Sequence, residues 1–429
     1  MNKKNVRETG IKVMSVVCTL LLFAGGLHFC GRLLVNKQSS QKYEQFFQTD
    51  KEFDVLFIGS SHVINGVSPL DLFRNYGIVS FNLSMHGNYV KSGYYILSQA
   101  LRILEREKRQ LPKVVVLDIY ADGESVAALH NAWDGFAFSS IKREMVKELG
   151  GESKMELAVP FLLYHNRWKE LRKNDFRPDA NTWYGVELRY GVSLPGQEII
   201  RDAAVTEPAD EGKIAYVDRI RQLCQDHGIR LALIHIPYSY EPGWQREANW
   251  YDSYAREHDL IYVNYMNQDI GIDFDIDFYD QGHLNPAGMR IMTDALGTLL
   301  RDMGVEDRRN GSRAGEWSEE YKEFIRYRIN KLNEIAQADV YLMSLQDPDL
   351  GCVIQIRRNL LEDKQIKKLV ERLDRGENRI VIVEEFEEFE AFDGTEGEFD
   401  LYCVVYEKGD FSNPVHSAGF QVRESWEKK

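Results

Sequence analysis

The stretch Val55-Leu-Phe-Ile-Gly-Ser-Ser-His62 decides how this 429-residue chain folds. Four consecutive apolar residues are typical of a strand that is covered on both faces of a parallel sheet. A glycine and two serines follow at once, where a tight turn leads into a helix. The first N–H groups of that helix point toward the place where an oxyanion would form. Ser61 is therefore a candidate nucleophile, although the usual Gly-x-Ser-x-Gly pattern is absent.

Apolar runs like this one recur along the chain with helical stretches between them, at 53–59, 79–85, 113–120, 230–238 and 261–266. Their rhythm is that of repeated strand-helix-strand units. We expect an α/β fold in three layers, a doubly wound parallel sheet between helices, with the functional site at the carboxyl ends of the strands.

The second chemical signal is Asp280-Gln-Gly-His283, more than two hundred residues after the serine. A serine hydroxyl needs a base, and an imidazole held in one tautomer by a carboxylate is suited to that task. The three-residue spacing lets Asp280 reach His283 within one turn. Asn285 and Pro286 follow as N-cap and first residue of the last helix of the domain.

These motifs resemble the first and last conserved blocks of the SGNH/GDSL hydrolase family. The resemblance implies a flavodoxin-like sheet and a catalytic triad of Ser61, Asp280 and His283. The family's second block is similar to Asn82-Leu-Ser-Met-His-Gly87, which implies that Gly87 donates its N–H to the oxyanion.

The family's third block, Gly-x-Asn-Asp, is missing, because the third strand ends in Leu117-Asp-Ile-Tyr-Ala-Asp122. Asn88, Tyr120 or a residue of the insertion described below could replace the lost oxyanion donor. The whole layout resembles the membrane-anchored DltD-like proteins that assist D-alanylation of teichoic acid, and their alginate-acetylating analogues. That resemblance implies a cell-surface polysaccharide or teichoic-acid-like polymer as partner, together with a multi-span membrane O-acyltransferase.

An uncharged run of 19 residues, 13–31, is long enough to span a bilayer. It is longer than the core of a signal peptide and lacks a small-x-small cleavage site, so a retained single-pass anchor is favoured over cleavage. Four basic residues precede it: Lys3, Lys4, Arg7 and Lys12. We therefore expect residues 1–36 to form a cytoplasmic tail and anchor, with the remaining chain outside the cell membrane.

The domain division follows from two long intervals. Residues 37–305 should form the catalytic domain, with a helical insertion at 121–214 that contains helices at 140–149 and 164–171. The insertion is interpreted either as a lid or substrate surface, or as a further helical layer with Trp168 buried. Residues 306–429 should form a linker and a small α/β accessory domain, with a helix at 317–336, a strand at 340–345, a helix at 359–373 and strands at 379–383 and 401–406.

Composition excludes several classes of protein. A net charge of -14 argues against nucleic acid as a partner, and the five scattered cysteines indicate neither a disulfide framework nor a metal site. His62, His86 and His165 lack supporting ligands at metal-binding spacing, so no metal and no cofactor are expected. The leading hypothesis is a serine esterase or acyltransferase; the alternatives are a carbohydrate O-deacetylase and a non-catalytic cell-envelope scaffold.

Overall fold

The computed structural model describes most of residues 3–337, with gaps at 36, 121–125, 137–138, 160, 165–166, 170, 172–175, 177–180, 190–198, 201, 240 and 275–276. Beyond residue 337 it describes the strands 342–347, 351–356, 380–381, 398–407 and 410–423.

Five parallel strands form the central sheet: β1 (Val55–Ile58), β2 (Ser80–Asn82), β3 (Val114–Asp118), β4 (Arg230–His235) and β5 (Ile261–Asn264). Their order is β2-β1-β3-β4-β5, and each pairs in parallel with its neighbours. This is the flavodoxin-like, doubly wound order, in which sites gather at the carboxyl ends of the strands. The α/β fold and all five strands predicted from the sequence are confirmed.

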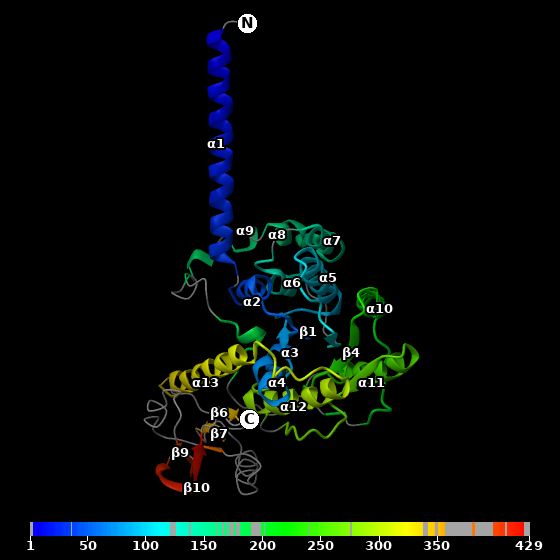
Figure 1. Ribbon diagram of the computed structural model, residues 1–429, viewed down its shortest axis with the longest axis vertical. Helices are drawn as coiled ribbons and strands as arrows, with labels where there is room; N and C mark the ends of the chain where they lie inside the picture. The colour runs from blue at the N-terminus through cyan, green and yellow to red at the C-terminus, as the bar shows by residue number, and fades with distance from the viewer. Residues whose placement is uncertain are drawn as a thin grey trace.

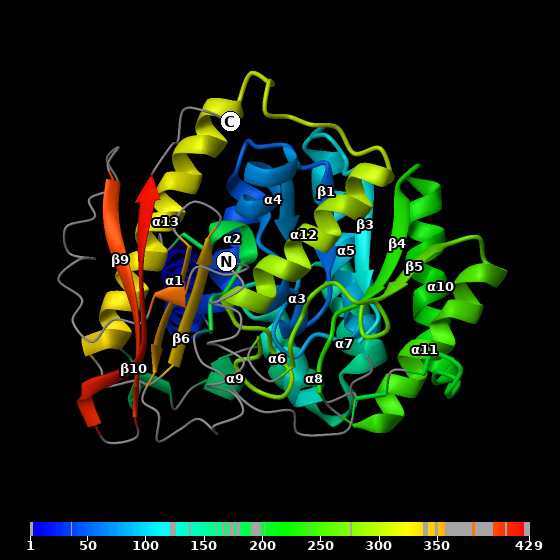
Figure 2. The ribbon, with the colours of Figure 1, turned by 90° about the horizontal axis from the view of Figure 1, so that it is seen from below.

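Both faces of the sheet are buried, and alternate residues of each strand enter different cores. Val55 and Phe57 pack into one apolar cluster, whereas Leu56 and Ile58 pack into the other. The first cluster includes residues of α4 (Pro69–Tyr76) and α12 (Pro286–Asp302). The second includes residues of α5 (Val90–Arg106) and α10 (Glu211–Asp226). Figure 2 shows α4 and α12 in front of the strands and α5 behind them.

Helix α12 begins as the sequence predicted. The Asn285 side chain accepts hydrogen bonds from the N–H groups of Ala287 and Gly288, at 3.0 and 3.2 Å. Pro286 occupies the first helical position, where no N–H is needed. A cap of this kind contributes about 1 kcal/mol to stability and fixes the point at which the preceding loop enters the helix.

The chain begins with the long helix α1 (Lys3–Leu34), followed by α2 (Lys37–Gln48). The segment Gly10–Gly31 of α1 is 22 residues long. By length and composition it is apolar enough to cross a membrane, and none of it is buried. Figure 1 shows α1 projecting away from the α/β body.

The insertion contains short helices: α6 (Val126–Trp133), α7 (Ser140–Leu149), η1 (Gly151–Ser153), α8 (Lys154–Ala158), α9 (Phe161–Tyr164), η2 (Arg167–Lys169) and η4 (Trp183–Gly185). The helix predicted at 140–149 is confirmed. The helix predicted at 164–171 is wrong, because α9 ends at Tyr164 and residues 167–169 form a single 3-10 turn. Trp168 is 61% exposed, so the interpretation of the insertion as a layer with a buried Trp168 is also wrong.

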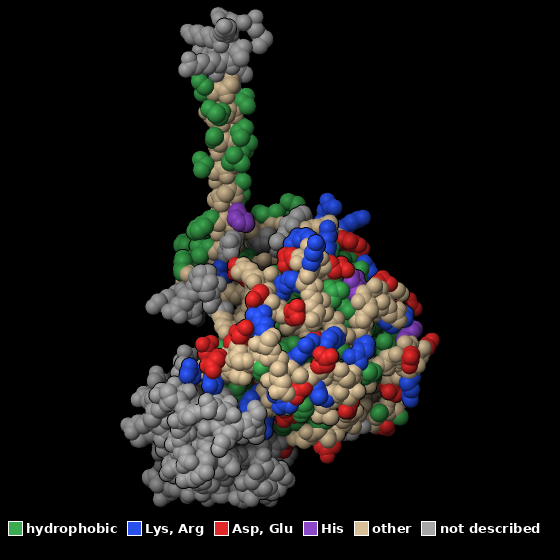
Figure 3. Space-filling model, in the orientation of Figure 1, with side chains coloured by type: hydrophobic (Ala, Val, Ile, Leu, Met, Phe, Trp, Pro, Cys, Tyr) green, Lys and Arg blue, Asp and Glu red, His purple; other side chains and the backbone are tan. Residues whose placement is uncertain are grey.

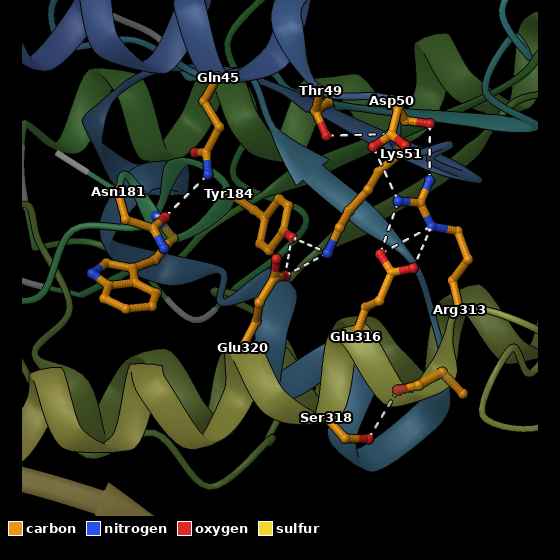
Figure 4. Close-up of polar contacts among 12 residues, drawn as sticks. Gln45, Thr49, Asp50, Lys51, Asn181, Tyr184, Arg313, Glu316, Ser318 and Glu320 are labelled. Carbon is orange, nitrogen blue, oxygen red and sulfur yellow. Dashed lines mark hydrogen bonds and ion pairs between the residues drawn. The ribbon is translucent and has the colours of Figure 1, made fainter. Parts of the chain in front are cut away.

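Helix α13 (Ala314–Gln337) packs against the α/β body. Trp317 is buried in the same apolar cluster as strand residue Leu56. The ammonium group of Lys51 donates to Glu320 and to the hydroxyl of Tyr184, both at 2.6 Å (Figure 4). The start of the region predicted as a linker and accessory unit is therefore tied to the first domain by apolar and ionic contacts.

The remaining strands are β6 (Leu342–Asp347), β7 (Gly351–Ile356), β8 (Ile380–Val381), β9 (Glu398–Glu407) and β10 (Asp410–Arg423). β6, β7 and β8 form one small sheet, and β9 pairs with β10. β6, β8 and β9 overlap the strands predicted from the sequence, whereas the helix predicted at 359–373 lies outside the described residues. The division into two domains stays a prediction.

Candidate active site

Ser61 is the first residue of helix α3 (Ser61–Gly66), which follows β1 directly. The hydroxyl of Ser60 caps this helix by accepting from the N–H of His62 at 3.3 Å. A Cβ atom at Gly59 would lie 2.5 Å from the side chain of Val63 and 2.9 Å from that of Asp118. Because only glycine fits there, the turn can close tightly enough to leave Ser61 at the end of the sheet.

Asp280 and His283 lie on one tight loop between β5 and α12. Asp280 Oδ1 accepts from the N–H groups of Gly282 and His283, each at 2.9 Å. An isolated antiparallel bridge between Phe278 and Leu284 closes the loop. The backbone of the loop therefore holds the Asp280 carboxylate in place independently of its contact with the His283 side chain.

The three side chains form one continuous chain of hydrogen bonds. His283 Nε2 lies 2.7 Å from the hydroxyl oxygen of Ser61. His283 Nδ1 lies 2.8 and 3.0 Å from the two carboxylate oxygens of Asp280. Partial burial alone would raise the pKa of Asp280, but the hydrogen bond and charge interaction with His283, together with the backbone N–H groups of Gly282 and His283, hold the pKa below its usual value. The carboxylate is thus ionised at neutral pH, as an orienting group must be.

The backbone N–H groups of Ser61 and Gly87, which were predicted to bind the oxyanion, stay candidates for that role. Neither the N–H of Ser61 nor that of Gly87 donates a hydrogen bond to another residue in the described part of the chain. Gly87 has a φ of 66°, and a Cβ there would lie 2.9 Å from Ala128. A side chain at this position would be both strained and crowded, so the conformation of the loop depends on glycine.

Asn88 and Tyr120, the two side chains predicted as oxyanion donors, both make contacts close to the serine turn. The Asn88 amide is buried and donates to the carbonyl of Gly59 at 2.9 Å, which fastens the second loop to the serine turn. The ring of Tyr120 packs edge-on against His62, with 4.0 Å between ring centres. These contacts give Asn88 a positioning role and leave the donor role of either residue a prediction.

Beneath the serine turn lies a buried cluster of three polar side chains, His62, Asp118 and His235. They are 4%, 3% and 0% exposed. His62 Nδ1, Asp118 Oδ2 and both ring nitrogens of His235 have no hydrogen-bond partner among the described residues. Burial raises the pKa of Asp118 to about 7 and lowers that of His235 to about 3. Burial and the nearby imidazoles of His283 and His235 also lower the pKa of His62 well below its usual value.

A hollow of about 150 Å³ adjoins the loop that carries Gly87, and six of its lining residues are Lys42, Ile64, His86, Trp183, Glu187 and Tyr327. His86 Nε2 and Glu187 Oε2 are 2.5 Å apart. Burial alone would raise the pKa of Glu187, but His86 and two neighbouring cations lower it to about 2. Lys42 is 6% exposed and donates to the carbonyl of Ser84 at 2.7 Å, and burial lowers its pKa to about 7.

The backbone beside this hollow is strained. Trp183 and Tyr184 have φ angles of 50° and 59°, which bulky residues rarely adopt. Gly185 follows with a φ of 94°, and a Cβ there would lie 2.0 Å from the carbonyl oxygen of Asn82. Strain of this kind costs about 1–3 kcal/mol for each residue and is concentrated at functional sites.

Sequence reasoning did not identify Lys42, Glu187, Asp118 or His235 as residues of the site. Lys42 and Glu187 lie 145 residues apart in the chain, and each contacts the loop at 84–87. No local motif marks such a site. Within the described residues, no group of three or more His, Cys, Asp or Glu side chains is placed to hold a metal ion.

No family model and no curated protein matches the sequence. Among solved structures, a protein provisionally described as an acylhydrolase from Bacteroides fragilis is 11% identical, with a TM-score of 0.33 over 62% of this chain and 98% of its own. A provisionally described G-D-S-L family lipolytic protein from Desulfitobacterium hafniense is 12% identical, with a TM-score of 0.30 over 58% and 99%. A provisionally described platelet activating factor from Streptococcus pneumonia is 13% identical, with a TM-score of 0.31 over 66% and 99%. All three TM-scores are below 0.5, which is too low to assign a function to the site. The chemistry of the site is therefore inferred from its own geometry.

Proposed function

We propose that this chain is a membrane-anchored serine esterase or acyltransferase of the SGNH/GDSL kind, which forms an acyl intermediate on Ser61. One observation carries the proposal: the unbroken hydrogen-bond chain from Ser61 through His283 to Asp280. A serine, an imidazole and a carboxylate in this order are the parts that convert a weak hydroxyl nucleophile into a reactive one.

The first half-reaction transfers an acyl group to the enzyme. Ser61 Oγ attacks the ester carbonyl carbon while its proton passes to His283 Nε2. Asp280 holds the ring tautomer and stabilises the imidazolium, and the N–H groups of Ser61 and Gly87 stabilise the oxyanion. When the C–O bond breaks, the leaving alcohol takes the proton from His283 and the acyl group remains on Ser61.

The second half-reaction depends on what enters. Water, activated by His283, gives a carboxylic acid and restores Ser61, which makes the protein an esterase or O-deacetylase. A polymer hydroxyl in place of water gives a new ester, which makes it an acyltransferase.

A polymer of sugar or polyol units, in the wall or at the surface of the cell, is the substrate that the hollow beside Gly87 supports. Trp183 and Tyr327 offer aromatic rings, while Glu187 and Lys42 offer polar groups within the same hollow. Aromatic rings pack on the apolar face of a sugar ring, and polar side chains bind its hydroxyl groups. Acetyl or D-alanyl is the proposed acyl group, and a multi-span membrane O-acyltransferase the proposed supplier.

A retained anchor and an outward-facing body complete the proposal. The apolar segment Gly10–Gly31 and the four basic residues before it support a single span with the N-terminus in the cytoplasm.

A fluorophosphonate probe applied to the full chain in detergent tests the chemistry. Wild type should be labelled on Ser61, and 4-nitrophenyl acetate should add one acetyl group to the same residue in the intact mass. Ser60→Ala is the matched control, because Ser60 is the neighbouring serine and only caps the helix. Labelling that survives Ser61→Ala in a folded protein would contradict the proposal.

An added acceptor distinguishes transferase activity from esterase activity. An acceptor such as a soluble oligosaccharide should appear in acetylated form, at the expense of free acetate, if the acyl-enzyme prefers hydroxyl groups to water. Release of acetate alone would support the esterase activity and rule out the transferase activity.

A further inference from the structure

Exposed apolar side chains of the body gather in one segment of the insertion. Outside α1, eight large hydrophobic residues are exposed among those described, and five of them lie in 155–176: Met155, Val159, Leu162, Trp168 and Phe176. We call these five residues the collar. Single exposed hydrophobic residues are ordinary, but a group of them marks a surface that contacts something apolar.

The collar lies at the foot of α1. The guanidinium of Arg167 donates to the carbonyl oxygens of Leu34 and Val35, at 2.9 and 3.1 Å, and thereby caps the end of the helix. Figure 1 shows α8 and α9 beside the lower end of α1. Figure 3 shows hydrophobic side chains that continue from the stem onto the body at this point.

The height of the collar follows from helix geometry. The apolar span ends at Gly31, and Leu34 lies three residues later, which is about 4.5 Å along the helix axis. A bilayer has a hydrocarbon core of about 30 Å and a total thickness of about 40–45 Å, so each headgroup layer is about 5–7 Å deep. Arg167, which contacts Leu34, is therefore level with the headgroups when α1 spans the membrane.

We propose that the collar is a second membrane contact, which lies in the headgroup layer of the leaflet from which the body emerges. This inference rests on the anchor in the proposed function. Trp168 has the amphipathic ring that favours this layer, and Lys169 lies above that ring with its nitrogen 5.6 Å from the ring centre. Lys154 and Lys169 are exposed and suit anionic headgroups.

The collar has a consequence for the active site. A single helix leaves the body free to tilt about its end, whereas a helix plus a collar defines a plane on the membrane. The loop of Gly87 and the hollow beside it would then be held at a constant height above the lipid. A substrate attached to the membrane surface or supplied by a membrane partner would be met in one orientation.

The experiment uses the full chain with its five cysteines replaced and one new cysteine that carries an environment-sensitive fluorophore. Leu162→Cys reports on the collar and Ile261→Cys is the control, because the two native side chains are 45% and 41% exposed. The proteins are reconstituted into vesicles of phosphatidylethanolamine and phosphatidylglycerol that contain a lipid with a nitroxide near its headgroup. We expect the label at 162 to be quenched several times more strongly than the label at 261.

The possible failures are distinguishable. Protein that leaves the vesicles in an alkaline wash has no span, which overturns the anchor and the collar but not the serine chemistry. Retained protein with equal quenching at 162 and 261 overturns the collar alone. A label at 162 that stays open to aqueous iodide in lipid vesicles but is shielded in native membranes shows that the collar binds a protein, and that also overturns the proposal.

Discussion

Two groups of polar side chains lie at the same edge of the sheet and are built in opposite ways. Ser61, His283 and Asp280 are joined by hydrogen bonds of 2.7 and 2.8 Å, and the side chains of His283 and Asp280 are 19% and 42% exposed. The ring of His62 lies 5.4 Å from that of His283, and both His62 and the neighbouring His235 are almost fully buried and have ring nitrogens without partners in the described part of the chain.

The difference teaches what a proton-transfer site requires. Hydrogen bonds and partial exposure let His283 gain and lose a proton beside a fixed carboxylate. Burial instead lowers the pKa of His62 and of His235, so both stay uncharged at neutral pH. No second positive imidazole then opposes the imidazolium that forms on His283 during catalysis. The two buried imidazoles therefore act as uncharged packing beside the reacting groups.

The largest effect should come from breaking the exposed chain of hydrogen bonds. Ser61→Ala and His283→Phe should each lower kcat on an activated acetyl ester by about 10⁶-fold. The double variant should be little worse than either, because the two residues act as a unit. Stopped assays on full-length protein, with folding checked by circular dichroism, measure this. Losses that multiply in the double variant would show that the two residues do not cooperate.

Asp280→Asn should have the next largest effect. The amide keeps a hydrogen bond to His283 Nδ1 but loses the charge that stabilises the imidazolium and can hold the wrong tautomer. A loss of up to about 10⁴-fold in kcat is expected by analogy with other triads. Asp269→Asn is the matched control, since Asp269 accepts a local backbone hydrogen bond from Gly271 and no other among the described residues. Equal rates in the two variants would remove Asp280 from the mechanism.

The sequence predicts the exposed group and misses the buried one for a physical reason. Asp280 and His283 are three residues apart, and Ser61 is marked by the glycine that its turn requires, so local spacing and turn chemistry identify them. The unbroken apolar runs predict the five strands in the same way. Asp118 and His235 lie at the ends of the neighbouring strands β3 and β4, and only the pairing of these strands, which aligns Asp118 with Ile234, brings both to the same edge of the sheet. No local sequence pattern reveals which residues of two strands lie side by side.

The helical insertion shows the same limit. Residues 164–171 contain a helix-like pattern, yet the structure has a short turn there with Trp168 exposed. A composition of apolar and basic residues is compatible with a buried layer and with a surface that meets lipid. Only the position of the segment at the foot of α1 separates the two.

A third prediction tests the buried cluster through pH. Burial raises the pKa of Asp118 to about 7, so the folded protein holds a proton that the unfolded chain releases above about pH 4. The unfolding free energy therefore falls as the pH rises from about 4 to 7 and then levels off, by at most about 4 kcal/mol for a three-unit shift. Asp118→Asn keeps an acceptor for the N–H of Ile236 and removes this dependence.

The measurement is the difference in Tm between wild type and Asp118→Asn at about pH 5 and about pH 8. The Tm of the variant, relative to that of the wild type, should be higher at the more alkaline of the two pH values. The lowered pKa of Lys42 has the opposite sign and makes stability rise with pH, but it is common to both proteins and cancels in the difference. Parallel Tm curves would show that Asp118 is not held in its protonated form.

The smallest effect should come from His235→Phe, which repeats the His283→Phe change at the buried histidine. His235 is 0% exposed, its ring nitrogens make no hydrogen bond to any described residue, and its ring packs edge-on against Tyr238 at 4.9 Å. The change therefore breaks no hydrogen bond and removes two buried polar atoms, while the larger ring adds some crowding. We expect the unfolding free energy to change by less than about 1 kcal/mol in either direction, and kcat to stay near the wild-type value. If His235→Phe instead lowers kcat as His283→Phe does, while folding and Tm are preserved, the buried histidine takes part in proton transfer and the contrast between the two groups is wrong.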